Sequence, residues 1–281
     1  MKSILTILFT ICIADFAFAQ TPDKALARVS YNLIHIRDTT QKNFPYTENM
    51  LLVIGKNASV FTSYDKINRE IEFNNPRRKA STAPFKPVTQ SDYYYFVKEN
   101  KVFTRDKMLT NYLAEEIAPV IKWQITKDTS SFSGIHCLKA ITHFKGRNWI
   151  AWFAPELPFQ SGPWKLNGLP GLIIEAYDDK KEVQFQFAGL ENTGKLSEAQ
   201  KLEQKKYKDN IFFGPEIIFP KDAVKTTKQE FDKLKDAFEK DPKGFISAAT
   251  GTPVNRIYTG VSMNGEIHKT INNPIELIEK K

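Results

Sequence analysis

The stretch "GPWKLNGLPGLIIEAY", residues 162–177, places three glycines and two prolines directly before a run of apolar residues. A phosphate-binding loop needs glycines that open a helix, usually followed by a lysine and a hydroxyl residue. Here the last glycine is followed by Leu172-Ile173-Ile174, which favours a buried strand. The stretch therefore predicts a turn that leads into the core of a β-sheet, and not a nucleotide-binding loop.

The turn itself is expected to span Leu169–Leu172 and to be of type II. Proline suits the second position of such a turn, and glycine supplies the positive φ of the third. Gly168 lets the backbone bend before the turn. We therefore predict structural roles for Gly168, Pro170 and Gly171.

Further motifs accompany this stretch in a fixed order, namely Gly134–Ala140, Phe144–Phe153, Pro158, Gly162–Lys165 and Gly168–Ile173. Together they resemble the GLPGLI family of exported bacterial proteins, whose hexapeptide stands intact at Gly168–Ile173. The resemblance covers about residues 123–178 and extends more loosely to residues 50–63. It implies a cell-envelope protein, in some members one associated with outer-membrane receptor systems. It implies no established activity, cofactor or catalytic residue.

The N-terminus has the pattern of a secretory signal peptide over residues 1–19. Lys2 precedes an apolar core at Ile4–Ala14, and Ala17-Phe18-Ala19 fits the cleavage pattern. The apolar core is shorter than the about 20 residues of a membrane-spanning helix. We expect cleavage between Ala19 and Gln20 and export to the periplasm or cell envelope; a buried N-terminal helix is the alternative.

The rest of the chain, residues 20–281, is expected to form one β-rich domain. Export removes Cys12, so Cys137 remains alone and no internal disulfide can form. The net charge of +8 permits peripheral contact with an anionic membrane, or simply a solvated lysine-rich surface. No motif supports nucleic-acid binding.

The fold class that the patterns favour is mainly β (α+β). We predict an antiparallel meander of eight to ten strands that forms a curved sheet or half-barrel, with helices in the C-terminal third. The family-like core spans about 123–190, and the helical portion about 195–281. The predicted strands include 29–37, 50–54, 59–62, 93–97, 102–104, 117–125, 134–142, 147–153, 183–187 and 256–261. Residues 74–91 are predicted to be an exposed loop, and helices are predicted from Ser197 to about Tyr207 and after the capping box Thr227–Glu230 up to Asp241-Pro242.

Two groups of residues could bind a ligand. Arg147 begins an otherwise apolar strand, so it must be paired if buried, with Glu156 or Glu175 as the expected partner, or it recognises a ligand. The chain's tryptophans either fill the core or line a cavity between the sheet and the C-terminal helices. This second interpretation makes ligand-binding candidates of Trp149, Trp152 and Trp164.

Evidence for catalysis is weak. His136 and Cys137 are adjacent in a predicted strand and so point to opposite faces. The four histidines form no metal-binding motif, and there is no GxSxG sequence. We therefore predict a non-enzymatic protein without cofactor or metal that binds an apolar ligand or a membrane-associated protein partner, possible alternatives being an uncharacterised hydrolase or a structural surface protein.

Overall fold

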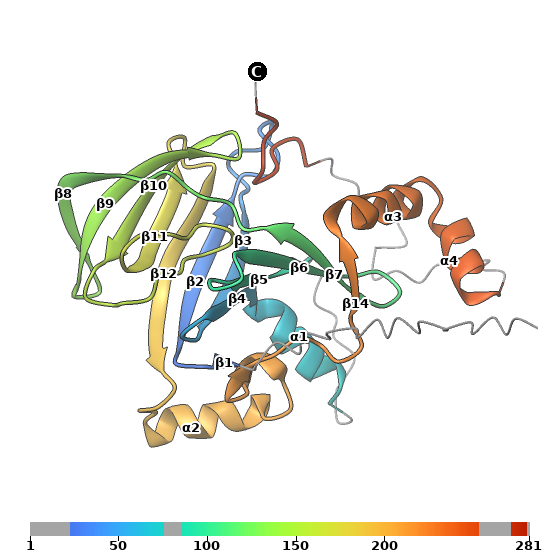
Figure 1. The fold of residues 1–281 in the computed structure, drawn as a ribbon, viewed down its shortest axis with the longest axis horizontal. Coiled ribbons are helices and arrows are strands. Elements are labelled where there is room, and N and C mark those ends of the chain that lie inside the picture. The colour runs from blue at the N-terminus through green and yellow to red at the C-terminus, as the bar shows by residue number, and fades with distance from the viewer. Residues whose placement is uncertain (1–22, 76–85, 253–270, 280–281) are drawn as a thin grey trace, which may run out of the picture.

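The computed structural model describes residues 23–75, 86–252 and 271–279, so the predicted signal peptide and the strand predicted at 256–261 lie outside the described residues. A sheet of 12 strands dominates the fold, in the order β14-β7-β6-β5-β4-β3-β2-β12-β11-β10-β9-β8 (Figure 1). A second, two-stranded sheet pairs β1 (Asp23–Lys24) with β13 (Glu216–Ile217).

The large sheet consists of two antiparallel meanders that join where β12 pairs with β2. The first meander runs through β2 (Ala27–His35), β3 (Tyr46–Ile54), β4 (Ala58–Ser63), β5 (Asp92–Phe96), β6 (Lys101–Lys107) and β7 (Asn111–Ile117). The second runs through β8 (Gln124–Phe132), β9 (Ile135–Phe144), β10 (Arg147–Ala154), β11 (Leu172–Asp178) and β12 (Val183–Asn192). The short strand β14 (Val224–Thr227) pairs with β7 in parallel at one edge. The prediction of a mainly β, mostly antiparallel sheet is confirmed, and the sheet does not close into a barrel.

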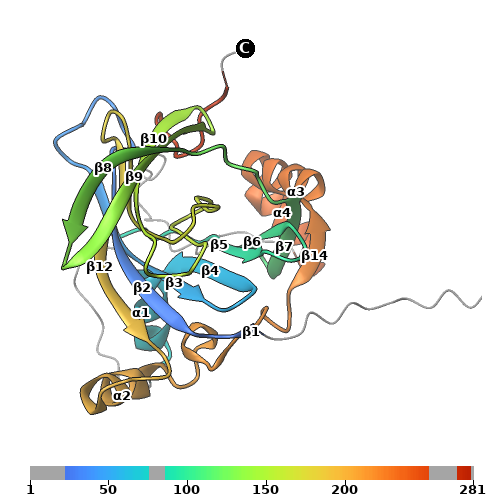
Figure 2. The same ribbon diagram turned by 60° about the vertical axis from the view of Figure 1, so that its left-hand side comes forward.

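The sheet curves around the segment that connects β10 to β11, residues 155–171, which we call the plug segment (Figure 2). Its side chains Trp164, Leu166 and Leu169 are buried against the concave face of the sheet. Inward-facing residues of β10, among them Trp149 and Phe153, meet them there. Residues 162–171, which were predicted to form a turn into the core, therefore help to fill it.

A second core lies on the opposite face of the sheet. Helix α1 (Tyr64–Phe73) begins at Ser63, whose side chain accepts a hydrogen bond from the Lys66 backbone N–H. Together with residues 207–219, this helix covers Tyr94 and Phe103. Every residue of β4 is buried, because both faces of this strand are covered. Helix α1 is not predicted by the sequence pattern, because it presents few apolar residues to the sheet.

The helices predicted near the C-terminus are confirmed. They are α2 (Glu198–Gln204) and α3 (Lys228–Lys240), which begin at complete capping boxes of Ser197 and Thr227. Asp241 ends α3 as predicted, but it also caps a further helix, α4 (Pro242–Thr250). Within the described ranges, no helix is long and apolar enough to span a membrane.

One predicted strand is wrong. The apolar run from Ile117 to Ile125 was expected to be a strand, but β7 ends at Ile117 and β8 begins at Gln124. Residues 118–123 have neither helical nor strand structure. Pro119 lies in this run and has no backbone N–H to donate to a ladder, which explains the interruption.

Candidate functional site

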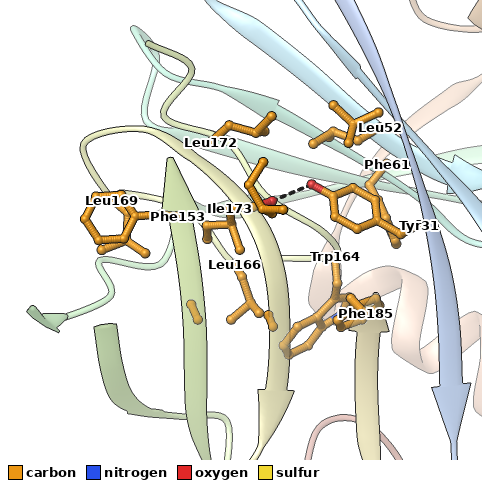
Figure 3. Close-up of a cluster of buried hydrophobic side chains, with 14 of the residues drawn as sticks. Tyr31, Leu52, Phe61, Phe153, Trp164, Leu166, Leu169, Leu172, Ile173 and Phe185 are labelled. Carbon is orange, nitrogen blue, oxygen red and sulfur yellow. Dashed lines mark hydrogen bonds between the residues drawn. The ribbon is translucent and has the colours of Figure 1, made fainter. Parts of the chain in front are cut away.

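One interpretation of the tryptophans predicts a ligand cavity between the sheet and the C-terminal helices, but the plug segment fills the concave face of the sheet. The Trp164 ring lies 5.7 Å from the rings of both Trp149 and Phe144, measured between centroids. Figure 3 shows Trp164, Leu166 and Leu169 among the inward-facing side chains of the sheet. Beside Trp164 a cavity of about 20 Å³ remains, lined by Tyr93 and Trp164 among others. It has room for a water molecule, but none for an apolar ligand.

The tryptophans do not share one site. Trp149 and Trp164 are buried in the main core, whereas Trp152 lies half-buried on the outer face of β10. There its ring packs 5.8 Å from that of Phe132, and its indole N–H reaches the Tyr177 hydroxyl at 3.4 Å. In this conformation the tryptophans that were candidates for one ligand site serve packing on two sides of the sheet.

The turn at the end of the plug segment differs from the expected type II geometry. Gly171 has a positive φ, as predicted, but its value of 149° is far from that of a type II turn. Its N–H donates to Leu169 O two residues earlier, and the N–H of Leu172 donates to Leu157 O. Gly168 also has a positive φ, of 86°. The chain thus enters β11 through a tighter turn, held by Leu157 at the other end of the plug segment.

One charged side chain of the plug segment is buried. Lys165 is 4% exposed, and its Nζ lies 3.0 Å from Glu116 Oε1 and 2.9 Å from Glu276 Oε1. Burial lowers the pKa of Lys165, but the two carboxylates more than offset this effect and raise it. Trp123 adds a hydrogen bond from its indole N–H to Asn167 O, 2.8 Å long. These contacts tie the plug segment to residues on β7, before β8 and near the C-terminus.

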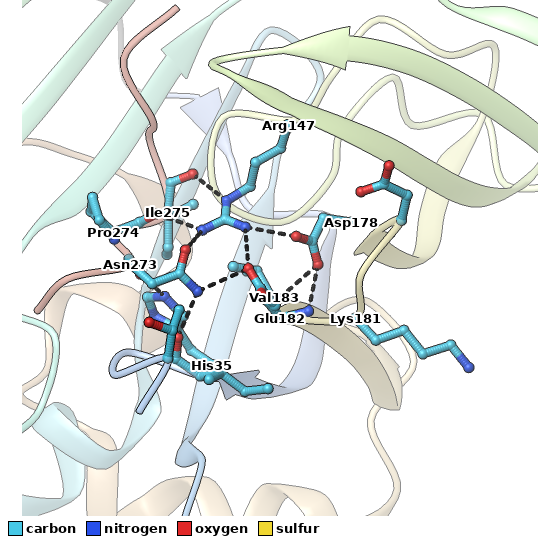
Figure 4. Close-up of polar contacts among 12 residues, drawn as sticks. His35, Arg147, Asp178, Lys181, Glu182, Val183, Asn273, Pro274 and Ile275 are labelled. Carbon is cyan, nitrogen blue, oxygen red and sulfur yellow. Dashed lines mark hydrogen bonds and ion pairs between the residues drawn. The ribbon is translucent and has the colours of Figure 1, made fainter. Parts of the chain in front are cut away.

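Arg147 is the centre of a buried polar cluster at the end of β10 (Figure 4). Its Nη1 donates to Asp178 Oδ2 at 2.6 Å and lies 3.6 Å from Glu182 Oε2. Its other nitrogens donate to the side chain of Asn273 and to the carbonyls of Pro274 and Ile275. We call residues 271–279, which supply these acceptors, the C-terminal strap.

The prediction that Arg147 pairs with Glu156 or Glu175 is wrong. Glu175 is paired in register with Trp152 and shares its outer face, so it points away from the cluster. Asp178, at the end of β11, faces Arg147 instead and also accepts the backbone N–H groups of Glu182 and Val183. The structure thus gives Arg147 a bonding network that joins two strands and the strap.

His35 belongs to the same cluster. It is 3% exposed, and its Nε2 lies 2.7 Å from Asn273 O, while Nδ1 has no hydrogen-bond partner among the described residues. Burial lowers its pKa to about 4, and Arg37 and Arg147 act in the same direction, whereas the bond to Asn273 opposes the shift. His35 is therefore neutral in the folded protein at neutral pH.

This shift predicts an acid sensitivity. The unfolded chain takes up a proton near pH 6.5 but the folded chain only near pH 4, so stability is lost as the pH falls through this window. The contribution of His35 is about 3 kcal/mol across the window. We expect urea unfolding at a series of pH values to show this loss, and His35→Gln to remove most of it. An unchanged slope in the variant would contradict the assignment. His143→Gln is the control, because the raised pKa of the exposed His143 acts in the opposite sense, its stabilisation being lost as the pH rises.

Cys137 is fully buried on β9. Burial raises the pKa of its thiol to about 11, and the nearby Glu175 adds to the shift. A thiol in this state is a poor nucleophile at neutral pH. The interpretation of Cys137 as a small packing residue therefore agrees with its environment.

Sequence reasoning missed a second buried polar cluster, which lies under α1. Asp92 is fully buried and pairs with Lys66 Nζ at 2.5 Å and with Arg105 Nε at 3.1 Å. Thr62 also donates to Asp92. Lys66 lies in α1, and because that helix was not predicted, no signal in the sequence indicated that Lys66 pairs with Asp92. Among the described residues, no group of three or more His, Cys, Asp or Glu side chains could hold a metal ion.

A groove of about 680 Å³ lies where the end of β7, the β5–β6 turn and the start of α3 meet. We call it the rim groove. At its edge the Ile117 side chain is 82% exposed, as is that of Val120 three residues later. The groove is lined by Glu99, Asn100, Lys101, Glu115, Glu116, Ile117, Lys225, Thr226, Thr227 and Glu230.

Comparisons with known proteins support a fold but no activity. The model of the Porph_ging family, described as a protein of unknown function, matches residues 85–175, a segment that includes the hexapeptide Gly168–Ile173. Comparison with curated proteins found no match. The structure of PNGF-II in space group P21 is similar at 13% identity with a TM-score of 0.50, and that in space group C2 at 12% with 0.49. In both cases the similarity covers 74% of this chain and 32% of the other, so this chain spans about a third of the length of PNGF-II. The chain is thus similar over residues 85–175 to a family of unknown function, and its fold to part of PNGF-II.

Proposed function

We propose that this protein is an exported, non-enzymatic binding protein of the cell envelope that docks a membrane-associated protein partner at the rim groove. The observation that carries the proposal is the exposure of two apolar residues, Ile117, which lines the groove, and Val120, three residues later in the chain, both of which are 82% exposed. Exposed apolar surface beside a groove suits a protein interaction site when a partner covers it. The filled interior supports a binding surface on the outside.

The charges that line the groove also favour one kind of partner, a basic one. Its lining includes the carboxylates of Glu99, Glu115, Glu116 and Glu230 but only two lysines, on a chain whose net charge is +8. Complementary charge speeds encounter and selects partners. The partner segment is therefore basic, with an apolar side chain that covers Ile117 and Val120.

The edge strand β8 is a weaker docking site. Its pairing with β9 shifts register between Ile125 and Thr129, and the charged residues Lys127 and Asp128 lie in the irregular part. Bulges and charges of this kind prevent another strand from adding to a sheet edge. The proposal therefore places the partner at the rim groove.

Membership of the GLPGLI family is part of the proposal. The hexapeptide Gly168–Ile173 and the match to a family of unknown function over residues 85–175 support it. The role as an accessory to an outer-membrane receptor system follows from that resemblance. N-terminal sequencing of envelope material tests the export step: we expect the chain to begin at Gln20, and intact Met1 in a cytoplasmic fraction would contradict export.

Site-specific photo-crosslinking in the native host tests the docking site. Benzoylphenylalanine at Val120 should give one discrete adduct with an envelope protein, and Ile117→Asp should abolish it. The same label at Leu202, which is 65% exposed on α2, is the control and should give none. Because both changes replace exposed side chains, we expect melting to stay nearly constant. Equal adducts from both positions, or none from Val120, would refute the rim groove as the docking site.

A further inference from the structure

We propose that the plug segment is a displaceable occupant of a second, apolar binding site, and that the C-terminal strap holds it in place. The ligand class is an acyl chain with an anionic head group. This inference does not need a partner at the rim groove, although both sites include Glu116. It rests on how the plug segment is attached, on a strained residue within it, and on the charges that surround its only buried lysine.

The tip of the plug segment, residues 163–169, is attached through side chains. Within the part of the chain that the structure describes, its backbone bonds to another segment only where the Trp123 indole donates to Asn167 O. The strands on either side are different, since β10 and β11 pair with each other and with their outer neighbours. The tip can therefore leave the concave face without breaking the ladder of the sheet.

Trp164 is held in an unfavourable backbone conformation. Its φ is 55°, in the left-handed region that a bulky side chain rarely adopts. Such strain persists only where surrounding contacts impose it, and it gathers at functional sites. Here the packing of the Trp164 ring against the tilted rings of Trp149 and Phe144 imposes it. Release of the tip would relieve the strain.

Lys165 links the plug segment to the strap. Glu276 of the strap lies between two ammonium groups, 2.9 Å from Lys165 Nζ and 3.3 Å from Lys145 Nζ. The strap is itself anchored to Arg147, and its Leu277 N–H donates to Lys145 O. Glu116 on β7 completes the pairing of Lys165. The strap thus latches the plug segment through one carboxylate.

The space behind the plug segment defines the ligand. Its walls are inward-facing apolar side chains, including Leu52, Phe61, Phe153 and Phe185, which suit a hydrocarbon chain (Figure 3). When the tip leaves, Lys165 moves with it, and its ammonium group separates from Glu276, which stays on the anchored strap, paired with Lys145. An anionic head group, carboxylate or phosphate, would replace Glu276 as the partner of Lys165.

Hydroxyl-radical footprinting of the full-length protein tests the latch. Glu276→Gln should increase the oxidation rate of Trp164 at least tenfold, because the plug tip opens more often, and leave Tyr94 in the second core unchanged. Lys165→Met, which removes the latch from the other side, should act in the same way. The matched control is Glu279→Gln, which breaks the exposed pair between the strap and His143 but leaves Lys165 paired. An unchanged rate at Trp164, or a parallel rise at Tyr94, would overturn the latch.

Ligand binding is measured with cis-parinaric acid and with an anionic phospholipid that carries the same chain in vesicles. We expect at least one probe to bind about tenfold more tightly to Glu276→Gln than to the wild type, and to raise Trp164 oxidation. The responding probe identifies a free acid or a lipid as the source. Binding of neither probe to Glu276→Gln would overturn the ligand site. Photo-crosslinking at Val120 is unaffected by either result, so failure here is distinguishable from failure of the rim groove.

Discussion

Arg147→Ala is expected to lower the free energy of unfolding by about 3–5 kcal/mol, the usual cost of removing one member of a buried ion pair. The variant leaves the Asp178 carboxylate 1% exposed without its cation. It also leaves three acceptors of the strap, in Asn273, Pro274 and Ile275, without their donor. Urea unfolding at neutral pH measures the loss.

The matched control is Lys201→Ala. Lys201 pairs with Glu198 on the surface of α2, with both side chains more than half exposed. Pairs of this kind contribute about 0–1 kcal/mol. Asp178→Asn in the Arg147→Ala background should restore part of the loss, since it removes the unpaired charge. A loss below about 1 kcal/mol in Arg147→Ala would show that the strap does not depend on this cluster.

The sequence predicted that Arg147 must be paired if it is buried, but it did not predict the right partners. The condition follows from local pattern alone, because an arginine at the start of an apolar strand is costly to bury without a partner. The acceptors, however, come from the end of β11 and from the strap, which lies more than 120 residues later in the chain. No periodicity within β10 encodes such a distant contact.

The same distinction holds for the fold. Alternation in residues 147–153 predicted that Trp149 and Phe153 face one side, and both are buried there. Capping boxes predicted the starts of α2 and α3, since the cap and its partner lie within one turn. The pairing of β12 with β2 joins segments about 150 residues apart, and it decides that the sheet is continuous. Local signals carry no information on that pairing.

The interpretation of the tryptophans shows why the site was harder to predict than the fold. An aromatic side chain in a core and one that lines a cavity leave the same pattern in a strand, because both face inward. The difference is made by the plug segment, whose Trp164 and Leu166 occupy the space that a ligand would need. The motif that predicted a turn into the core therefore also decides what the interior holds.

Substitution at Gly171 tests whether this motif both leads the chain into the core and holds the plug segment there. At a φ of 149°, any side chain strains the backbone, and a Cβ would overlap Ala154 O and approach Pro155 Cα to 2.9 Å. These atoms belong to the backbone at the end of β10, so they cannot move aside as a flexible side chain would. Gly171→Ala should therefore destabilise the protein by about 2–4 kcal/mol, from strain and overlap together.

Gly168→Ala is the matched control for backbone strain alone. Its φ of 86° is also positive, but a Cβ there meets nothing within 4 Å. We expect a cost of about 1–2 kcal/mol, as for a single left-handed residue. Thermal or urea unfolding of both variants separates the two contributions, because only Gly171 adds contact with Ala154. If Gly171 instead permitted a ligand to approach the backbone, Gly171→Ala would lose binding while its unfolding curve matched the wild type. Equal destabilisation by the two variants would show that the close approach of Gly171 to β10 does not hold the plug segment.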